Sequence, residues 1–136
     1  CSSLTSITIP DSVTTIGGYA FYECTSLTSI TIGDSVTTIG DFAFCDCDSL
    51  TELTLPSTLW AVGYYAFASG SYKQSRTFYF KSIDPPYTLS NGEWGVFSGN
   101  YVELTTIYVP TESVERYKTA DGWNEYADYI FGYDFE

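Results

Sequence analysis

The sequence contains no histidine, and this absence narrows the chemistry that the chain can perform. Histidine is the commonest general base and the commonest metal ligand in proteins, so Ser-His and Cys-His nucleophile pairs are excluded. Basic residues are scarce as well, with 5 Lys and Arg against 17 Asp and Glu and a formal net charge of −12. Such a charge is unfavourable beside a phosphate backbone or an anionic membrane. We therefore exclude most hydrolase mechanisms, and we expect no nucleic acid partner.

Long hydrophobic runs are missing too. No apolar run approaches the ~20 residues that a membrane-spanning helix needs, although apolar residues make up 44% of the chain. Nothing in the sequence resembles a signal peptide. A chain of 136 residues has the length of one domain, which buries roughly 70% of its unfolded surface. We expect a single domain that does not insert into a membrane.

A repeat of 23 residues organises the first half of the sequence. The units 1–23 and 24–46 are identical at 17 of 23 positions, which only duplication explains. A third, more divergent unit follows at 47–69, so the repeat is the first feature to interpret. Cysteines open the three units, at Cys1, Cys24 and Cys47.

Seven positions of the unit are apolar in all three copies. They are Leu4, Leu27 and Leu50; Ile7, Ile30 and Leu53; Ile9, Ile32 and Leu55; Val13, Val36 and Leu59; Ile16, Ile39 and Val62; Ala20, Ala43 and Ala66; and Phe21, Phe44 and Phe67. Such columns are typical of a solenoid, in which each coil rests its inward side chains on those of its neighbours. The centre of the predicted core consists of Leu27, Ile30, Ile32, Val36, Ile39, Phe44 and Phe67.

Each unit is expected to form one strand, a turn and a shorter extended segment. In the first unit Ile7 and Ile9 point inward and Thr8 points outward, with the β-branched residues of a strand. Proline and a short polar residue then form the turn, at Pro10 and Asp11 in the first unit. A glycine ends the second segment, at Gly17, Gly40 or Gly63, where it allows either a positive φ or close approach of the next coil.

Two further coils are predicted after the regular repeats. Phe78-Tyr79-Phe80 lies 25 residues after Leu53-Thr54-Leu55, and Leu104–Pro110 repeats the pattern of Leu4–Pro10. In the longer connection between them, Val96-Phe97 stands in for the Ala-Phe pair. The matches predict five coils in all, with irregular coils over 70–110.

From Pro110 the pattern becomes helical. Thr111 is the expected N-cap, with Glu112 and Glu115 in the first turn. Asp121-Gly122 breaks this helix, and a second short amphipathic helix is predicted from Trp123, Tyr126, Ala127 and Ile130. We therefore divide the chain into a solenoid over 1–110 and a helical cap over 111–136, which covers the apolar face of the last coil.

The repeat C-x-S-L-T-x-I-T-I-P-x-S-V-T-x-I-G-x-x-A-F resembles the 23-residue leucine-rich repeat of the BspA-like family. The likeness is close over 1–68 and looser over the fourth and fifth coils. The segment IYVPTESVERYKTADGWNEYADYI is similar to the C-terminal capping segment often found on these bacterial proteins.

This resemblance implies a β-rich, right-handed leucine-rich-repeat solenoid of parallel strands with short capping helices. It also implies an extracellular or bacterial cell-surface location and a role in adhesion, host-protein binding or coaggregation. The implied partner is a host or bacterial surface protein, and no enzyme activity or cofactor comes with the family.

The cysteines are expected to be buried free thiols. Cys1, Cys24 and Cys47 share one column of coils stacked about 4.8 Å apart, and their side chains point the same way, which we expect to be poor disulfide geometry. Cys45 lies outside this column. A zinc site at Cys45 and Cys47 would need two further ligands, and no histidine exists to supply one.

The acidic residues are expected to lie in solvated turns and not to form a metal-binding or catalytic site. Asp41, Asp46 and Asp48 lack the regular spacing of a calcium-binding loop, so we expect no calcium site there. Two carboxylates in a cleft could hydrolyse a glycosidic bond, but five short coils offer no obvious cleft. No catalytic residue and no metal ligand is predicted.

The candidate binding residues lie on the outward side of the strands. The outward column reads Thr8, Thr31, Thr54, Tyr79 and Tyr108, and the adjacent column reads Ser6, Ser29, Glu52, Thr77 and Thr106. Tyrosines there add large contact area with little rotamer entropy, although tyrosine also suits any exposed strand. Trp94, in the long connection, could stack on a sugar ring or cover its own loop. The candidate ligand-binding residues are thus Glu52, Thr54, Tyr79, Trp94 and Tyr108.

Together these observations predict a noncatalytic protein-recognition module of a bacterial cell-surface or secreted protein. Two alternatives stay open: carbohydrate recognition through Tyr79, Trp94 and Tyr108, and a structural spacer within a longer repeat protein. Because no capping segment precedes Cys1, we also expect further repeats upstream in a longer parent chain. In isolation the unpaired strand of the first coil would favour end-to-end self-association.

Overall fold

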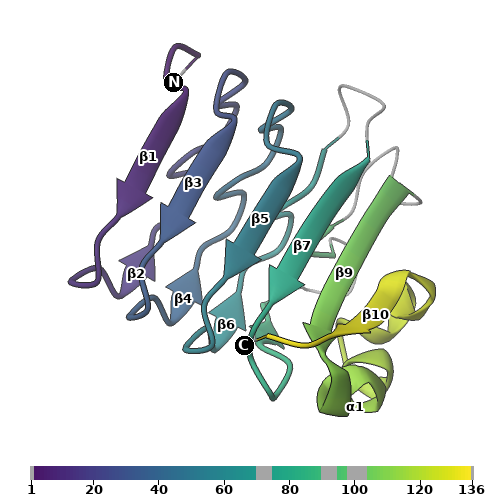
Figure 1. The fold of residues 1–136 in the computed structure, drawn as a ribbon. Coiled ribbons are helices and arrows are strands. Elements are labelled where there is room, and N and C mark those ends of the chain that lie inside the picture. Colours follow the sequence, from purple (N-terminus) through teal and green to yellow (C-terminus); the bar gives the residue numbers. More distant parts are fainter. Residues whose placement is uncertain (1, 70–74, 90–94, 98–103, 136) are drawn as a thin grey trace.

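The computed structural model describes residues 2–69, 75–89, 95–97 and 104–135. Its long strands lie side by side in chain order, one from each successive coil (Figure 1). They are β1 (Ser6–Ile9), β3 (Ser29–Ile32), β5 (Glu52–Leu55), β7 (Arg76–Phe80) and β9 (Thr105–Pro110). A second sheet is built from the short strands β2 (Thr15–Ile16), β4 (Thr38–Ile39), β6 (Ala61–Val62) and β8 (Tyr87–Thr88). All these strand pairs are parallel, so the predicted β-rich solenoid is confirmed.

Equivalent positions of neighbouring coils pair in register. Ile7 of β1 pairs with Ile30 of β3. Phe78 of β7 pairs with Leu53 of β5 and with Ile107 of β9, which confirms the predicted alignment of the fourth and fifth coils. Strands β3 and β5 are not hydrogen-bonded to each other, so the long strands form a two-stranded part and a separate part that begins at β5.

A third set of backbone hydrogen bonds joins the coils at the Ala-Phe turns. The bonds run from Phe21 N to Ala43 O (2.8 Å), from Phe44 N to Ala66 O (2.8 Å) and from Phe67 N to Val96 O (2.9 Å). Val96 thus accepts the bond that an alanine accepts in the regular repeats. The predicted replacement of the Ala-Phe pair by Val96-Phe97 is confirmed.

A column of phenylalanines runs through the core. Phe44 stacks between Phe21 and Phe67, with ring centroids 5.2 and 5.7 Å away. Phe67 also stacks on Phe97 at 5.7 Å. The predicted core residues that are buried are Leu27, Ile32, Val36, Ile39, Phe44 and Phe67. Ile30 is only half-buried, because it lines the opening between β3 and β5.

Two repeat glycines are required by the close approach of coils. A Cβ on Gly40 would clash with the backbone of Gly18, and a Cβ on Gly63 would clash with the backbone of Asp41. Positive φ angles occur instead two residues after each repeat glycine, at Tyr19 (60°), Phe42 (59°) and Tyr65 (55°). Of the two roles that the sequence allowed for these glycines, close approach is the one observed.

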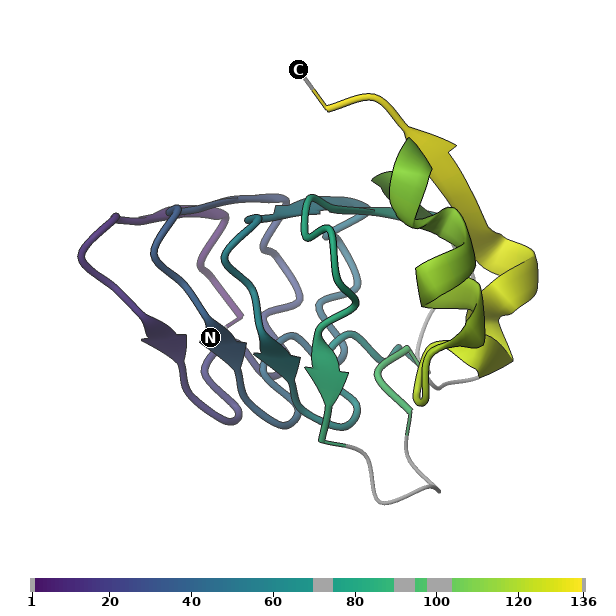
Figure 2. The same cartoon turned by 90° about the horizontal axis from the view of Figure 1, so that it is seen from below.

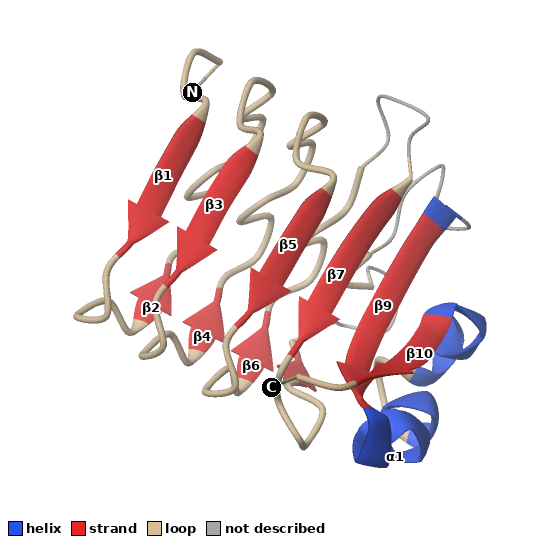
Figure 3. Cartoon of the chain, in the orientation of Figure 1, coloured by secondary structure: helices blue, strands red, loops and turns tan. Residues whose placement is uncertain are grey.

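After β9 the chain forms a cap at the C-terminal end of the stack (Figures 2 and 3). It comprises the 3₁₀ helix η2 (Thr111–Ser113), the helix α1 (Val114–Thr119), the 3₁₀ helix η3 (Asn124–Tyr129) and the strand β10 (Ile130–Tyr133). The expected N-cap is wrong, because Thr111 Oγ1 donates to Asp134 Oδ1 at 3.1 Å and Ser113 precedes α1. Gly122, with φ of 82°, lies after the end of α1, as the sequence predicted.

The second predicted helix is only partly correct. It is a 3₁₀ helix that ends at Tyr129, and Ile130 then begins β10, which pairs in parallel with β9. The free edge of β9 explains this outcome, because an edge strand offers unpaired N–H and C=O groups to any segment that can lie beside it. The cap therefore adds one more strand to the sheet that begins at β5.

The expectation of free thiols is wrong for Cys24. Cys24 is disulfide-bonded, whereas Cys45 and Cys47 are free. The spacing argument failed because coils about 4.8 Å apart fall within the ~4.4–6.8 Å between Cα atoms that disulfides span. Cys1, the remaining cysteine of the column, lies outside the described residues.

Candidate functional site

The outward surface of β1, β3, β5, β7, β9 and β10, which we call the long-strand face, carries the predicted binding column. Thr54 pairs with Tyr79, Tyr79 with Tyr108, and Tyr108 with Phe131. The side chains of one column therefore form a continuous row that changes from threonine to aromatic at the C-terminal half.

Five aromatic side chains gather at this half and form what we call the aromatic cluster. Its members are Tyr79, Tyr108, Phe131, Tyr133 and Phe135. Tyr79 and Tyr108 stack with centroids 5.3 Å apart, and Tyr133 lies 5.2 Å from the first and 5.5 Å from the second. The cluster thus combines the two predicted tyrosines with three rings from β10 and the residues after it.

Those three rings were missed because the segment was expected to be helical. The signal was present, since the sequence Ile130-Phe-Gly-Tyr-Asp-Phe alternates in the manner of a strand. Ile130 is buried while Phe131 and Tyr133 are 50% and 44% exposed. Alternation of buried and exposed residues places an aromatic side chain outward at every second residue.

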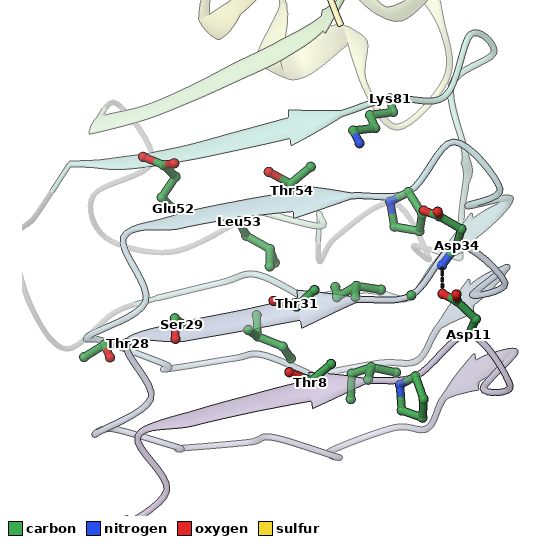
Figure 4. A pocket seen from close by; sticks show the side chains of 16 residues that line it. Thr8, Asp11, Thr28, Ser29, Thr31, Asp34, Glu52, Leu53, Thr54 and Lys81 are labelled. Atoms are coloured by element: carbon green, nitrogen blue, oxygen red, sulfur yellow. Dashed lines mark hydrogen bonds between the residues drawn. The ribbon is translucent and has the colours of Figure 1, made fainter. Parts of the chain in front are cut away.

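A groove of about 860 Å³ opens beside the cluster, where β3 and β5 are not paired. Glu52 and Thr54 lie on the β5 side, and Thr31 lies on β3 (Figure 4). Lys81, which follows β7, lies toward the other end of the groove from Glu52. At this end Asp34 N donates to Asp11 Oδ1 at 3.0 Å.

Lys81 connects the groove with the aromatic cluster. It lines the groove and also a smaller pocket of about 280 Å³ bordered by Tyr133 and Phe135. Burial, followed by the negative charge of Glu52, raises the pKa of Tyr79. The phenol therefore stays protonated and can donate a hydrogen bond to a ligand. Polar and aromatic contacts are thus available on one continuous surface.

Four of the five predicted binding residues lie on the long-strand face. Glu52 and Thr54 line the groove, and Tyr79 and Tyr108 belong to the aromatic cluster. Trp94 lies outside the described residues, so its predicted role in sugar stacking stays a prediction.

The acids that were considered for calcium have protein partners. Asp41 Oδ1 accepts a hydrogen bond from Tyr64 N at 3.1 Å, and Asp48 Oδ1 accepts one from Ser69 Oγ at 3.0 Å. Within the described ranges, no group of three or more Cys, Asp or Glu side chains is arranged to hold a metal ion.

The two free thiols lie in the core, away from the long-strand face. Burial, followed by the negative charge of Asp46, raises the pKa of Cys45 to about 12. Burial also raises the pKa of Cys47 to about 11, and its Sγ donates to Phe21 O at 3.0 Å. A thiol that stays protonated is a poor nucleophile, so neither group is suited to catalysis.

These pKa values predict a loss of stability at alkaline pH. An unfolded thiol ionises near pH ~8.5, whereas Cys45 in the folded chain ionises only near about 12. The contribution to stability is complete below about pH 8.5 and is lost as the pH rises toward 12, because only the unfolded chain then gains from ionisation. The Cys45→Ala variant has no thiol at this position, so its stability does not depend on the ionisation of residue 45. The third repeat already carries Ala68 at the equivalent position.

The measurement compares the free energy of unfolding of wild type and Cys45→Ala between pH 8 and pH 11. We expect the wild type to lose stability relative to the variant over this range. If the free energies of unfolding of the two proteins changed with pH in the same way, the pKa of Cys45 would be the same in the folded and the unfolded chain.

A comparison with known protein families identifies the repeat that forms the stacked coils. A family model described as the BspA type leucine rich repeat region matches residues 1–120, in six copies. The chain belongs to this family. BspA-type repeats are generally noncatalytic protein-interaction modules. A comparison with curated proteins gave no match.

The BspA-type coils explain the geometry of the site. Each repeat contributes one long strand, so ligand contacts of successive coils line up in columns. No helix in the described part of the chain has the length and apolar character needed to cross a membrane.

Proposed function

We propose that this BspA-type chain is a protein-recognition module of a bacterial cell-surface or secreted protein that acts in adhesion or host interaction. The observation that carries the proposal is the aromatic cluster on the long-strand face. Tyr133 and Phe131 keep about half of their surface exposed there. Contiguous exposed rings of this kind are enriched at protein interfaces and in their hot spots.

The repeat itself supports a binding role for the cluster. Thr8, Thr31 and Thr54 occupy the same outward column in the regular coils. Threonine therefore satisfies the fold at this position, and tyrosine is not needed to build a coil. Tyr79 and Tyr108 add apolar contact area together with a phenolic hydroxyl, which suits a partly wet interface.

The charges of the groove suggest what the partner offers. Asp11, Asp34 and Glu52 line the groove with Lys81 as the basic residue, and the whole chain carries a formal charge of −12. A partner with an apolar centre and a basic rim would be steered toward this face and held by it.

Location outside the cell is part of the proposal. Its support is the family, whose members are often surface-associated. Host or bacterial surface proteins are then the partners that the long-strand face would meet.

A carbohydrate ligand is the second candidate function. The pair Tyr79 and Tyr108, whose rings lie 5.3 Å apart, favours it, because each phenol combines an apolar ring with a hydroxyl group that can bond to a sugar. A spacer role would require neither the exposed rings nor the groove.

The proposal predicts selective binding in a paired screen. The chain and its Tyr108→Thr variant are tested against a panel of purified extracellular-matrix proteins and against a glycan array. We expect at least one protein of the panel to bind the wild type and to bind the variant roughly tenfold more weakly, as loss of an interface hot spot implies. Binding to glycans alone would favour the second candidate, and binding to neither would favour the spacer.

A further inference from the structure

A second surface, beside the short strand β6, carries two exposed aromatic side chains. Trp60, which precedes β6, is 62% exposed, and Tyr87, the first residue of β8, is 65% exposed. Their rings meet edge to face with centroids 5.3 Å apart and planes inclined by 67°. Ile83 is also exposed and lines the same groove, and exposed apolar side chains that gather in one place are typical of interaction sites.

These aromatic residues depart from the repeat. Trp60 occupies the position that Thr14 and Thr37 hold in the first two coils, and the same backbone bond, from Trp60 N to Thr37 O at 2.7 Å, anchors it. Tyr87 pairs with Ala61, whose counterparts in the first coils are Thr15 and Thr38. Threonine satisfies the coil at these places, so the large rings are not needed for the fold.

The two rings border a groove of about 760 Å³. Its lining comes from the turn after β5, from the loop between β7 and β8, and from the cap between α1 and η3. The residues that matter for recognition are Trp60, Ile83, Asp84, Pro85, Tyr87 and Asp121.

The loop that forms one wall is held by hydrogen bonds from the cap. Ser113 Oγ donates to Ile83 O at 2.6 Å, Tyr117 OH to Ser82 O at 2.8 Å, and Trp123 Nε1 to Pro86 O at 2.8 Å. All three donors belong to buried residues. The wall is therefore already fixed before any ligand arrives, which reduces the entropy lost on binding.

We propose that this groove binds an extended, proline-rich segment that carries a basic residue. Grooves lined by aromatic side chains bind polyproline II helices, which have little conformational entropy to lose. The indole N–H of Trp60, which has no hydrogen-bond partner in the described part of the chain, can donate to a carbonyl of such a segment. This site is separate from the long-strand face and does not depend on the function proposed for that face.

The charges of the groove favour a basic ligand over a neutral sugar. Asp84 and Asp121 line it, and no Lys, Arg, Asn or Gln is found among the lining residues that the structure describes. Asp84 is paired with Arg116 at 2.9 Å, whereas Asp121 has no ion pair within the described ranges. A cation is attracted to the carboxylate of Asp121 and to the aromatic faces, whereas a neutral sugar gains nothing from the negative charge.

The test measures binding of a fluorescent decapeptide of eight prolines between two arginines. Two control peptides replace the prolines by glycine and serine, or the arginines by glutamates. We expect the first peptide to bind wild type at least about tenfold more tightly than either control, because the prolines supply pre-ordered contact and the arginines supply charge. Trp60→Thr and Tyr87→Thr, which restore the residues of the first coils, should each weaken binding about tenfold. Asp121→Asn should weaken it about threefold and reduce its salt dependence.

The matched control is Tyr19→Asn, an exposed aromatic position of the first coil at which φ is 60° and asparagine is tolerated. Its affinity for the peptide should equal that of wild type, and circular dichroism should show that all four variants are folded. Equal binding of the glycine-serine peptide, an unchanged affinity of folded Trp60→Thr, or binding of chitin and cellulose oligosaccharides in place of the peptide would each overturn the proposal.

Discussion

Replacing Phe44 by alanine is expected to lower the free energy of unfolding by ~3–5 kcal/mol, the range for truncating a fully buried aromatic side chain. Phe44 is 2% exposed, and its ring stacks on Phe21 on one side and on Phe67 on the other. The coils above and below are fixed by backbone hydrogen bonds at the same turn, from Phe21 N and Phe44 N. The cavity can therefore collapse only in part.

Phe21→Ala is the matched control for this experiment. Phe21 has the same place in the first coil but is only half-buried and has one stacking partner in the column. We expect about 1–2 kcal/mol for it, because part of the ring already faces water. Denaturant melts of both variants test the prediction. A loss below about 1 kcal/mol for Phe44→Ala would show that the phenylalanine column does not support the core.

Removing the cap by ending the chain at Pro110 is expected to cause aggregation and the loss of about 5 kcal/mol of stability or more, since several large side chains leave the core together. The side chains lost include Tyr117, Trp123, Tyr126 and Ile130, all buried. Trp123 packs on Phe80 at 5.0 Å, and Tyr126 OH accepts a hydrogen bond from Phe97 N at 3.2 Å. Truncation would also expose the edge of β9 that β10 covers.

A chain that ends at Tyr133 provides the control. It keeps β10 and the buried cap residues and loses the bond from Thr111 Oγ1 to Asp134 and the ring contacts of Phe135 with Tyr79 and Tyr133. We expect only a small change in stability, within about 1 kcal/mol. Light scattering and denaturant melts compare the two truncations. A chain ending at Pro110 that is monomeric and as stable as wild type would refute the capping role of 111–136.

The repeat made most of the solenoid predictable. Identical units constrain each inward position several times over, so the columns through Leu27, Val36 and Ile39 could be read without any structure. The fourth and fifth coils followed because Phe78 and Ile107 keep the inward place despite longer connections. In these coils the apolar pattern of each strand and its stacking on the neighbouring coil favour the same structure. The sequence alone was therefore sufficient to predict the coils.

Features set by contacts between distant segments were not predictable. The pattern through Tyr126 and Ile130 suits a helix, but the edge of β9 selects a strand for Ile130–Tyr133. The groove between β3 and β5 has no mark in the sequence, because Glu52–Leu55 reads like any other long strand of the repeat. Trp60 and Tyr87 come into contact because the chain after the irregular loop forms β8, whose first residue, Tyr87, pairs with Ala61 of β6.

The most direct measurement of the recognition role is a pair of experiments on the Tyr79→Thr/Tyr108→Thr double variant. Its affinity for the protein partner found in the panel and its free energy of unfolding are compared with those of wild type. If the aromatic cluster serves recognition, affinity falls at least about thirtyfold, or ~2 kcal/mol, while stability changes by only about 1 kcal/mol, as expected for one lost cross-strand aromatic pair. Unchanged affinity together with a large loss of stability would contradict this role and would show that the cluster stabilises the fold instead.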